Sequence, residues 1–229
     1  MNFNQRKWVF IILIGGCIQF IVITFTSMFF YKGGTYIDPS TSCYVFWNNY
    51  FSDLGRTIAH SGIPNTISFI LFTISLSIWG LSQIPFYVTL TSFFKKDKGL
   101  KSYSILGSLF GVLTGIFYTG IAFTPSDILN LPHDIFVFIG FGSMFLSLIL
   151  YSIAISRDSS YPNLYAKISV ISALILGTYF IILSLVPSSL TPLGLFIYVV
   201  GQKIMIYTLL INGIIQGFGA LKQWESIIK

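Results

Sequence analysis

Lys203 is the residue whose chemistry most needs an explanation, because it stands inside a long apolar run near the C-terminus. Counted from Pro192, it lies about eleven residues into a predicted helix, or about 16 Å at 1.5 Å per residue. A charge at that depth of a bilayer costs about 3 kcal/mol on insertion scales. The side chain could reach toward the interface, pair with an acid inside the bundle, or be neutral. A lysine held by carbonyls and hydroxyls would be structural, whereas one that faces a polar site could bind an anionic headgroup or substrate or serve a proton path.

Few acidic residues could form an ion pair with this lysine. Asp53, Asp127 and Asp134 all fall in or next to segments predicted on one side of the membrane, and no glutamate lies in a predicted span. The sequence therefore predicts a polar site in that half of the protein, with Lys203 as its floor. The candidate ligand-binding residues are Asp53, Arg56, Asp127, His133, Asp134, Gln202 and Lys203.

A metal or a catalytic set has weaker support in the sequence. Asp53, Asp127 and His133 could give a divalent metal two carboxylates and an imidazole. His133 and Asp134 equally suit the start of a helix after Pro132, where the positive end of the helix dipole favours an acid. The chain has no G-x-S-x-G, no H-E-x-x-H and no glycine-rich phosphate loop, so we assign no catalytic residue, no metal and no cofactor.

The elements that would position these residues are membrane-spanning helices. The chain of 229 residues is 54% hydrophobic and 9% charged, whereas soluble domains carry about 25% charged residues. Its mean hydropathy is +0.81. We therefore expect an all-α bundle that forms one domain, with each span meeting the requirement of about 20 residues. The predicted spans are Trp8–Phe30, Asn65–Phe93, Tyr103–Phe123, His133–Ile155, Leu164–Val186 and Pro192–Ala220.

Positive charges alternate between the two sides of this predicted bundle. They occupy the N-terminus (Arg6, Lys7), the second loop (Lys95, Lys96, Lys98, Lys101), the fourth loop and its flank (Arg157, Lys167), and the C-terminal tail (Lys222, Lys229). The long first loop, residues 31–64, has only Lys32 and Arg56. The positive-inside rule therefore places both termini in the cytoplasm and the first loop outside. The net charge of +6 then reflects topology, and nucleic-acid binding is not expected.

The first loop is rich in aromatic residues, which suits an interfacial belt or a lid over an outer pocket. Cys17 and Cys43 differ in predicted membrane depth, so we expect no disulfide between them. Gly107, Gly111 and Gly115 recur every four residues, which predicts a flat stripe for close helix packing. Pro85 is expected to kink the second helix.

Several short motifs resemble those of a known family. The segment Asn49–Gly55, with the sequence NYFSDLG, is similar to the N-x-x-S-D-L-G signature of an uncharacterised family of prokaryotic membrane proteins, catalogued as domain of unknown function 998. Pro125–Asp127 followed by His133 resembles its second outer motif. Gly201–Lys203 resembles its last-helix pattern, although that pattern more often has Gln or Glu followed by Arg, and its later Trp is absent here. The resemblance implies the six-helix layout but no settled activity.

The Ser-Asp-x-Gly core of the same segment also looks like that of a eukaryotic six-helix family containing autophagy modulators and a lipid-remodelling factor for GPI anchors. That weaker resemblance implies a role connected with lipids. Our leading hypothesis is a multi-pass protein of the cell membrane that binds a lipid headgroup or small amphiphile in an outer polar pocket. A membrane-embedded lipid hydrolase and a small transporter are the alternatives. Membrane lipids are the expected partners, and the sequence leaves a homo-oligomer open.

Overall fold

The computed structural model describes residues 3–94, 98–185 and 190–228, and within these ranges the chain forms six long helices. Lys95, Lys96 and Lys229, and the predicted end of the fifth span at Val186, lie outside the described residues. The helices are α1 (Phe3–Phe30), α2 (Thr66–Leu90), α3 (Lys98–Ala122), α4 (Asn130–Arg157), α5 (Asn163–Leu185) and α6 (Pro192–Ile228). Two short 3-10 helices, η1 (Ser52–Gly55) and η2 (Thr91–Phe93), complete the described elements. The predicted all-α class is therefore confirmed.

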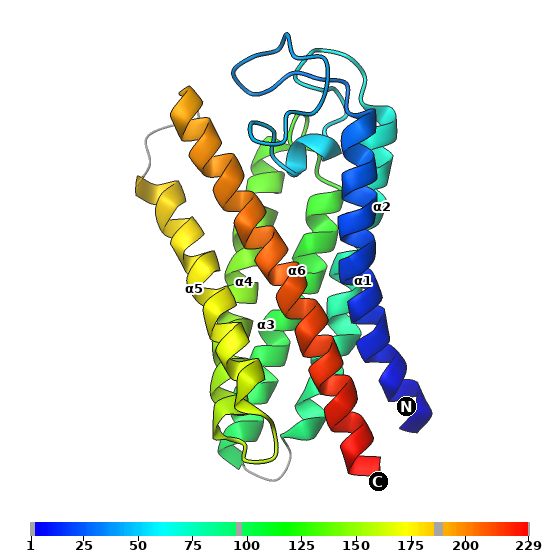
Figure 1. Cartoon of the computed structure of the whole chain (residues 1–229), viewed down its shortest axis with the longest axis vertical. Coiled ribbons are helices and arrows are strands. Elements are labelled where there is room, and N and C mark those ends of the chain that lie inside the picture. Colours follow the sequence, from blue (N-terminus) through cyan, green and yellow to red (C-terminus); the bar gives the residue numbers. More distant parts are fainter. Residues whose placement is uncertain (1–2, 95–97, 186–189, 229) are drawn as a thin grey trace.

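The helices run up and down in one bundle, and both termini lie at the same end (Figure 1). Each helix packs against its neighbours in sequence, and α6 returns to contact α1. The long loop, residues 31–64, covers the opposite end, which we call the loop end (Figure 1). We call the other the terminal end. α6 has 37 residues, so it is about 55 Å long and exceeds the roughly 30 Å of bilayer hydrocarbon.

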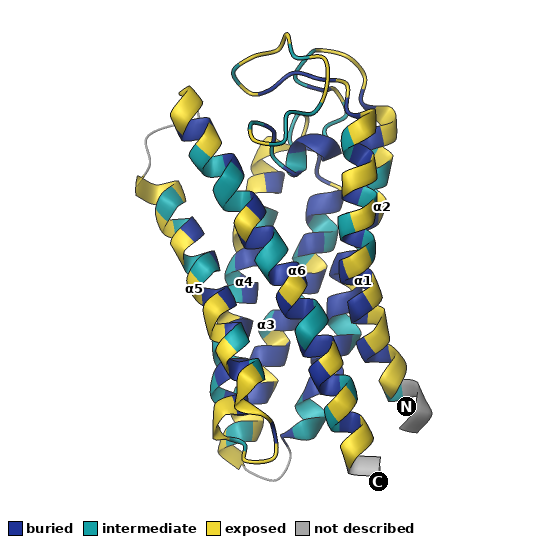
Figure 2. Cartoon of the chain, in the orientation of Figure 1, coloured by how far each residue is buried: buried dark blue, intermediate teal, exposed yellow. Residues whose placement is uncertain are grey.

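Exposed residues lie along the outer faces of the helices (Figure 2), and many of them are large hydrophobic residues such as Phe25, Val88 and Phe138. All six helices of the described chain contain a stretch long and apolar enough to cross a membrane. Exposing this apolar surface to water would be unfavourable, whereas lipid tails can surround it. Helices also satisfy their own backbone hydrogen bonds in lipid. The protein is therefore built as a multi-pass membrane protein.

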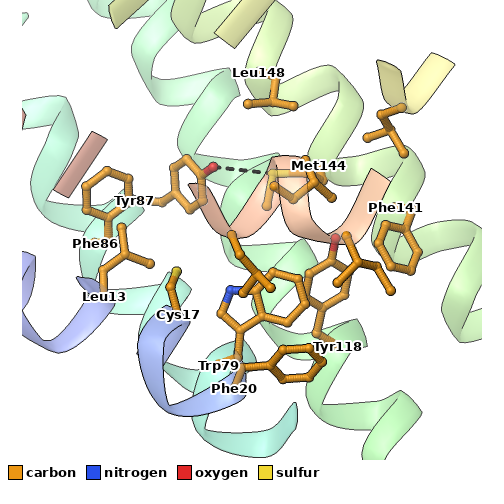
Figure 3. Close-up of a cluster of buried hydrophobic side chains, with 14 of the residues drawn as sticks. Leu13, Cys17, Phe20, Trp79, Phe86, Tyr87, Tyr118, Phe141, Met144 and Leu148 are labelled. Atoms are coloured by element: carbon orange, nitrogen blue, oxygen red, sulfur yellow. Dashed lines mark hydrogen bonds between the residues drawn. The ribbon is translucent and has the colours of Figure 1, made fainter. Parts of the chain in front are cut away.

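Aromatic side chains fill the centre of the bundle (Figure 3). The ring of Trp79 lies between those of Phe20 and Tyr118, with both centroid distances 4.8 Å. Tyr87 directs its hydroxyl to the sulfur of Met144 at 3.5 Å. These rings come from different helices, so their contacts join the helices into one core.

The predicted glycine stripe lies at the tightest helix contacts. A Cβ added at Gly111 would come within 2.2 Å of the Tyr87 ring, and one at Gly115 within 2.7 Å of the carbonyl oxygen of Gly80. α3 therefore approaches α2 more closely than any larger residue would allow. Pro85 lies inside α2, which continues on both sides of it.

Residues 31–64 not only cover the loop end but also fold into the bundle. Phe51, Asp53 and Leu54 are each at most 4% exposed. η1 carries these residues down between the helix ends (Figure 1). The loop is therefore a plug, and its polar backbone must find partners among the helices.

Candidate ligand site under the loop

Lys203 is buried, with 3% of its surface exposed, and its partner is the backbone of the plug. Its Nζ donates a hydrogen bond to the carbonyl oxygen of Asn49 at 2.5 Å. The hydroxyl of Tyr44 donates to the same oxygen at 3.0 Å. Within the described chain, no carboxylate forms an ion pair with Lys203. The partner of Lys203 is thus a carbonyl oxygen of the plug, as the structural alternative for this lysine predicted, and not one of the acids.

Three aromatic rings of the plug surround the same nitrogen. Nζ of Lys203 lies 4.9 Å from the ring centroid of Phe46, 5.4 Å from that of Phe51 and 5.5 Å from that of Tyr44. An ammonium within about 6 Å of a ring centroid is attracted to the ring's negative face. Lys203 therefore holds the plug from below and is not a free charge facing a cavity.

Gln202 binds the plug beside Lys203. Its Oε1 accepts a hydrogen bond from the backbone N–H of Phe51 at 2.9 Å. Because an N–H can only donate, this contact fixes which end of the amide is oxygen. The Nε2 group of Gln202, which can donate two hydrogen bonds, has no hydrogen-bond partner among the described residues.

Asp53 is occupied within the plug itself. Its Oδ2 accepts from Asn49 Nδ2 at 3.0 Å and from the Tyr50 N–H at 2.9 Å. Its Oδ1 lies 3.0 Å from Nε2 of His60, within hydrogen-bond distance. The carboxylate therefore stabilises the fold of the plug, and the asparagine and aspartate of the NYFSDLG segment contact each other directly.

Asp127 fastens the plug to the turn between α3 and α4. It accepts hydrogen bonds from the hydroxyl of Thr57 at 2.5 Å, from the Thr57 N–H at 3.1 Å and from the Ile58 N–H at 2.9 Å. Burial opposes ionisation of this carboxyl, but the three donors outweigh burial and lower the pKa of Asp127 below its usual value. Asp127 is therefore a charged anchor for residues 57 and 58.

His133 is 6% exposed at the start of α4, and its Nδ1 lies 2.7 Å from the carbonyl oxygen of Thr124. A carbonyl oxygen only accepts, so Nδ1 carries the proton in this contact. In the neutral ring, Nε2 is then a hydrogen-bond acceptor. It has no partner among the described residues.

Asp134 and Arg56 lie apart from these groups. Asp134 is exposed and lines an open groove between α4 and α5 with Phe138 and Phe180. Arg56 donates from Nε to the carbonyl oxygen of Ile58 at 3.1 Å on the surface of the loop. The structure thus divides the single polar site that the sequence predicted. Its residues Asp53, Arg56, Asp127, His133 and Asp134 are distributed between the plug, the α3–α4 turn and the membrane-facing surface.

A metal centre finds no support in this arrangement. Over the described part of the chain, no three His, Cys, Asp or Glu side chains lie close enough to hold a metal ion together. Asp53, Asp127 and His133 each bind different protein groups. Cys17 is buried and Cys43 is exposed, and neither forms a disulfide.

A cavity of about 50 Å³ lies directly beneath the plug. All the long helices except α5 contribute to its wall, and Phe51 and Ser52 of the plug close it from the loop end. Its wall is mostly aromatic and aliphatic, and Figure 3 shows Phe20, Trp79 and Tyr118 from it side by side. Ser52, His133 and Gln202 are the polar exceptions among the lining residues. Two of the predicted site residues, His133 and Gln202, therefore meet here.

Sequence reasoning missed the partners that define this site. Asn49 acts through its carbonyl oxygen and Thr57 through its amide and hydroxyl. Only Asn49 carried a signal, because it opens the NYFSDLG segment. The aromatic wall could not be recognised from the sequence, because Trp79 and Tyr118 lie among many other apolar and aromatic residues of their spans.

The fold and this site define a multi-pass helical membrane protein with a plugged cavity at one end. Comparisons with protein-family models, with curated proteins and with solved structures find no match. The motif resemblances of the NYFSDLG segment therefore stay predictions, and function must be argued from the site.

Proposed function

We propose that the protein binds a lipid or another small amphiphile in the cavity beneath the plug, without catalysis. The observation that carries this proposal is the cavity itself, with an apolar wall and three polar groups that no described protein group satisfies, the Ser52 hydroxyl, His133 Nε2 and Gln202 Nε2. Ligand sites are concave and mostly apolar, with a few polar groups that orient the ligand. A buried polar group without a partner is costly, so a ligand that satisfies it gains affinity.

The plug would act as the cover of this site. It is fastened by Lys203 and Gln202 from α6 and by Asp127 from the α3–α4 turn. Asn65 and Ser68 at the start of α2 also donate hydrogen bonds to the Leu54 carbonyl oxygen, so opening the cover would break contacts with α2, α6 and the α3–α4 turn together. We further propose that this cover faces the outside of the cell membrane, as the distribution of lysine and arginine indicates.

The two alternatives gain nothing from the site. A hydrolase needs a nucleophile or a metal beside a base. Ser52 and His133 both line the cavity, but no hydrogen bond joins them among the described residues, and the carboxylates near the cavity are bound to loop amides and side chains. A transporter needs polar groups that continue to the terminal end. About 15 Å of helix separates Gln202 from Asn212, the nearer member of the next polar pair, Asn212 and Gln216. The aromatic core of Figure 3 fills the bundle interior.

Filling the cavity tests the proposal. Val137 lines the cavity, whereas Val88 is 60% exposed on the surface of α2. We expect native mass spectrometry of the purified wild-type protein to show a bound small molecule that Val137→Phe loses and Val88→Phe keeps. Val137→Ala, which enlarges the cavity and avoids overpacking, should keep it. Equal retention by Val137→Phe and Val88→Phe would contradict the proposal.

A further inference from the structure

The polar groups in the cavity wall specify more about the ligand than its apolar character. His133 offers an acceptor at Nε2, because its Nδ1 proton is given to Thr124. Gln202 offers a donor at Nε2, because its Oε1 is held by the Phe51 N–H. A ligand that satisfies both must donate one hydrogen bond and accept another, and the Ser52 hydroxyl of the same wall can take either role.

The charge and the size of the cavity limit which ligand groups can occupy it. Among the described residues, no Lys, Arg, Asp or Glu lines it, so an ionised headgroup would be desolvated there without a counter-charge. Its volume of about 50 Å³ is several times the roughly 10–15 Å³ of the same kind of volume that one water molecule needs. A hydroxyl group therefore fits this space with the plug in place. The cavity is only partly enclosed, so an attached chain can leave it.

We propose that the ligand is an uncharged lipid alcohol, with its hydroxyl in the cavity between His133 and Gln202. A hydroxyl donates one hydrogen bond to His133 Nε2 and accepts one from Gln202 Nε2, which leaves both groups satisfied. Its first carbons pack against Trp79, Tyr118 and Phe141 of the wall. This inference rests on the proposed function and names the chemical class that the site selects.

Photolabelling with a 16-carbon alcohol that carries a diazirine in its chain tests this inference. The full-length protein is labelled in lipid nanodiscs, and the modified peptides are identified by mass spectrometry. We expect labelling of α4 and α6 residues at the loop end. Unlabelled hexadecanol should compete, and hexadecane, palmitate and hexadecyl phosphate should each compete about tenfold less well, because they lack the paired donor and acceptor or carry charge.

Matched substitutions separate the two hydrogen bonds from general damage. Gln202→Glu keeps an acceptor for the Phe51 N–H and removes the donor, and His133→Phe removes the acceptor. Each should reduce labelling about tenfold. Gln223→Glu is the matched control, because it makes the same change at the terminal end of α6. Gln223 donates a hydrogen bond to the Ser160 carbonyl oxygen there, and its substitution should leave labelling unchanged.

The outcomes distinguish the two proposals. If no probe labels the cavity wall, both fail. If Val137→Phe abolishes labelling but palmitate or hexadecyl phosphate competes as well as hexadecanol, the amphiphile site stands and the lipid-alcohol inference is overturned. Unchanged labelling in both Gln202→Glu and His133→Phe also overturns it.

Discussion

Replacing Lys203 by methionine removes the contact that holds the plug from below while it keeps the length of the side chain. The hydrogen bond to the Asn49 carbonyl is lost, which costs about 1 to 3 kcal/mol depending on the charge of the nitrogen. This cost is a net value, which already counts the hydrogen bonds that the same groups would form with water. The loss of attraction to the three rings adds about 0.5 kcal/mol or more. The Asn49 carbonyl keeps Tyr44 as a partner, which limits the damage. We expect opening of the plug to become easier by about 2 kcal/mol, or about thirtyfold.

Hydrogen–deuterium exchange in nanodiscs measures this opening directly. The N–H groups of Val45 and Phe51 are bonded within or below the plug and should exchange about thirtyfold faster in Lys203→Met. Helix amides at the terminal end should be unchanged. Lys101→Met, at an exposed lysine of α3, is the matched control and should leave the plug as it is. Equal protection of Val45 and Phe51 in wild type and Lys203→Met would refute the role assigned to this lysine.

Three further predictions concern the anchor, the helix packing and the orientation. Asp127→Asn should speed amide exchange at Thr57 and Ile58, by about tenfold for a loss near 1.4 kcal/mol. Because the pKa of Asp127 is lowered in the folded protein, its stabilisation is complete above the ordinary value near 3.9 and is lost as the pH falls through the folded pKa. Wild-type exchange at these amides should therefore not change between pH 7 and pH 5 beyond its intrinsic rate, and a rise in that window would contradict the assignment. Gly111→Ala should lower the midpoint of thermal unfolding, because the added Cβ would clash with the Tyr87 ring. Gly142→Ala is the control and should leave the midpoint unchanged, because a Cβ there would meet nothing within 4 Å. Equal midpoints would contradict the close packing of Gly111 against Tyr87. A membrane-impermeant maleimide should label exposed Cys43 in intact cells and fail with Cys43→Ala, and labelling only after permeabilisation would reverse the proposed orientation.

The architecture was predictable from the sequence because the bilayer sets a length that an apolar helix must reach. A chain with so few charges has no other solvent in which its helices can be stable. The glycine stripe of α3 was predictable for the same reason, since spacing alone indicates which face is flat. The described helices confirm the all-α class.

The site was predictable only in part, because its decisive contacts use the backbone. Lys203 stood out as a cation in an apolar run, but the carbonyl of Asn49 that binds it has no signature in the side-chain pattern. Neighbouring residues of a helix also point about 100° apart, so His133 faces the cavity and Asp134 faces the membrane side. Sequence order could not decide which of the two faced inward.

A density map of the protein in lipid nanodiscs would show whether a ligand occupies the cavity beneath the plug. We predict elongated non-protein density that begins between His133 and Gln202 and passes Trp79. A cavity of the same shape that holds nothing, or only ordered water, in maps that resolve the surrounding side chains and annular lipids would contradict this prediction.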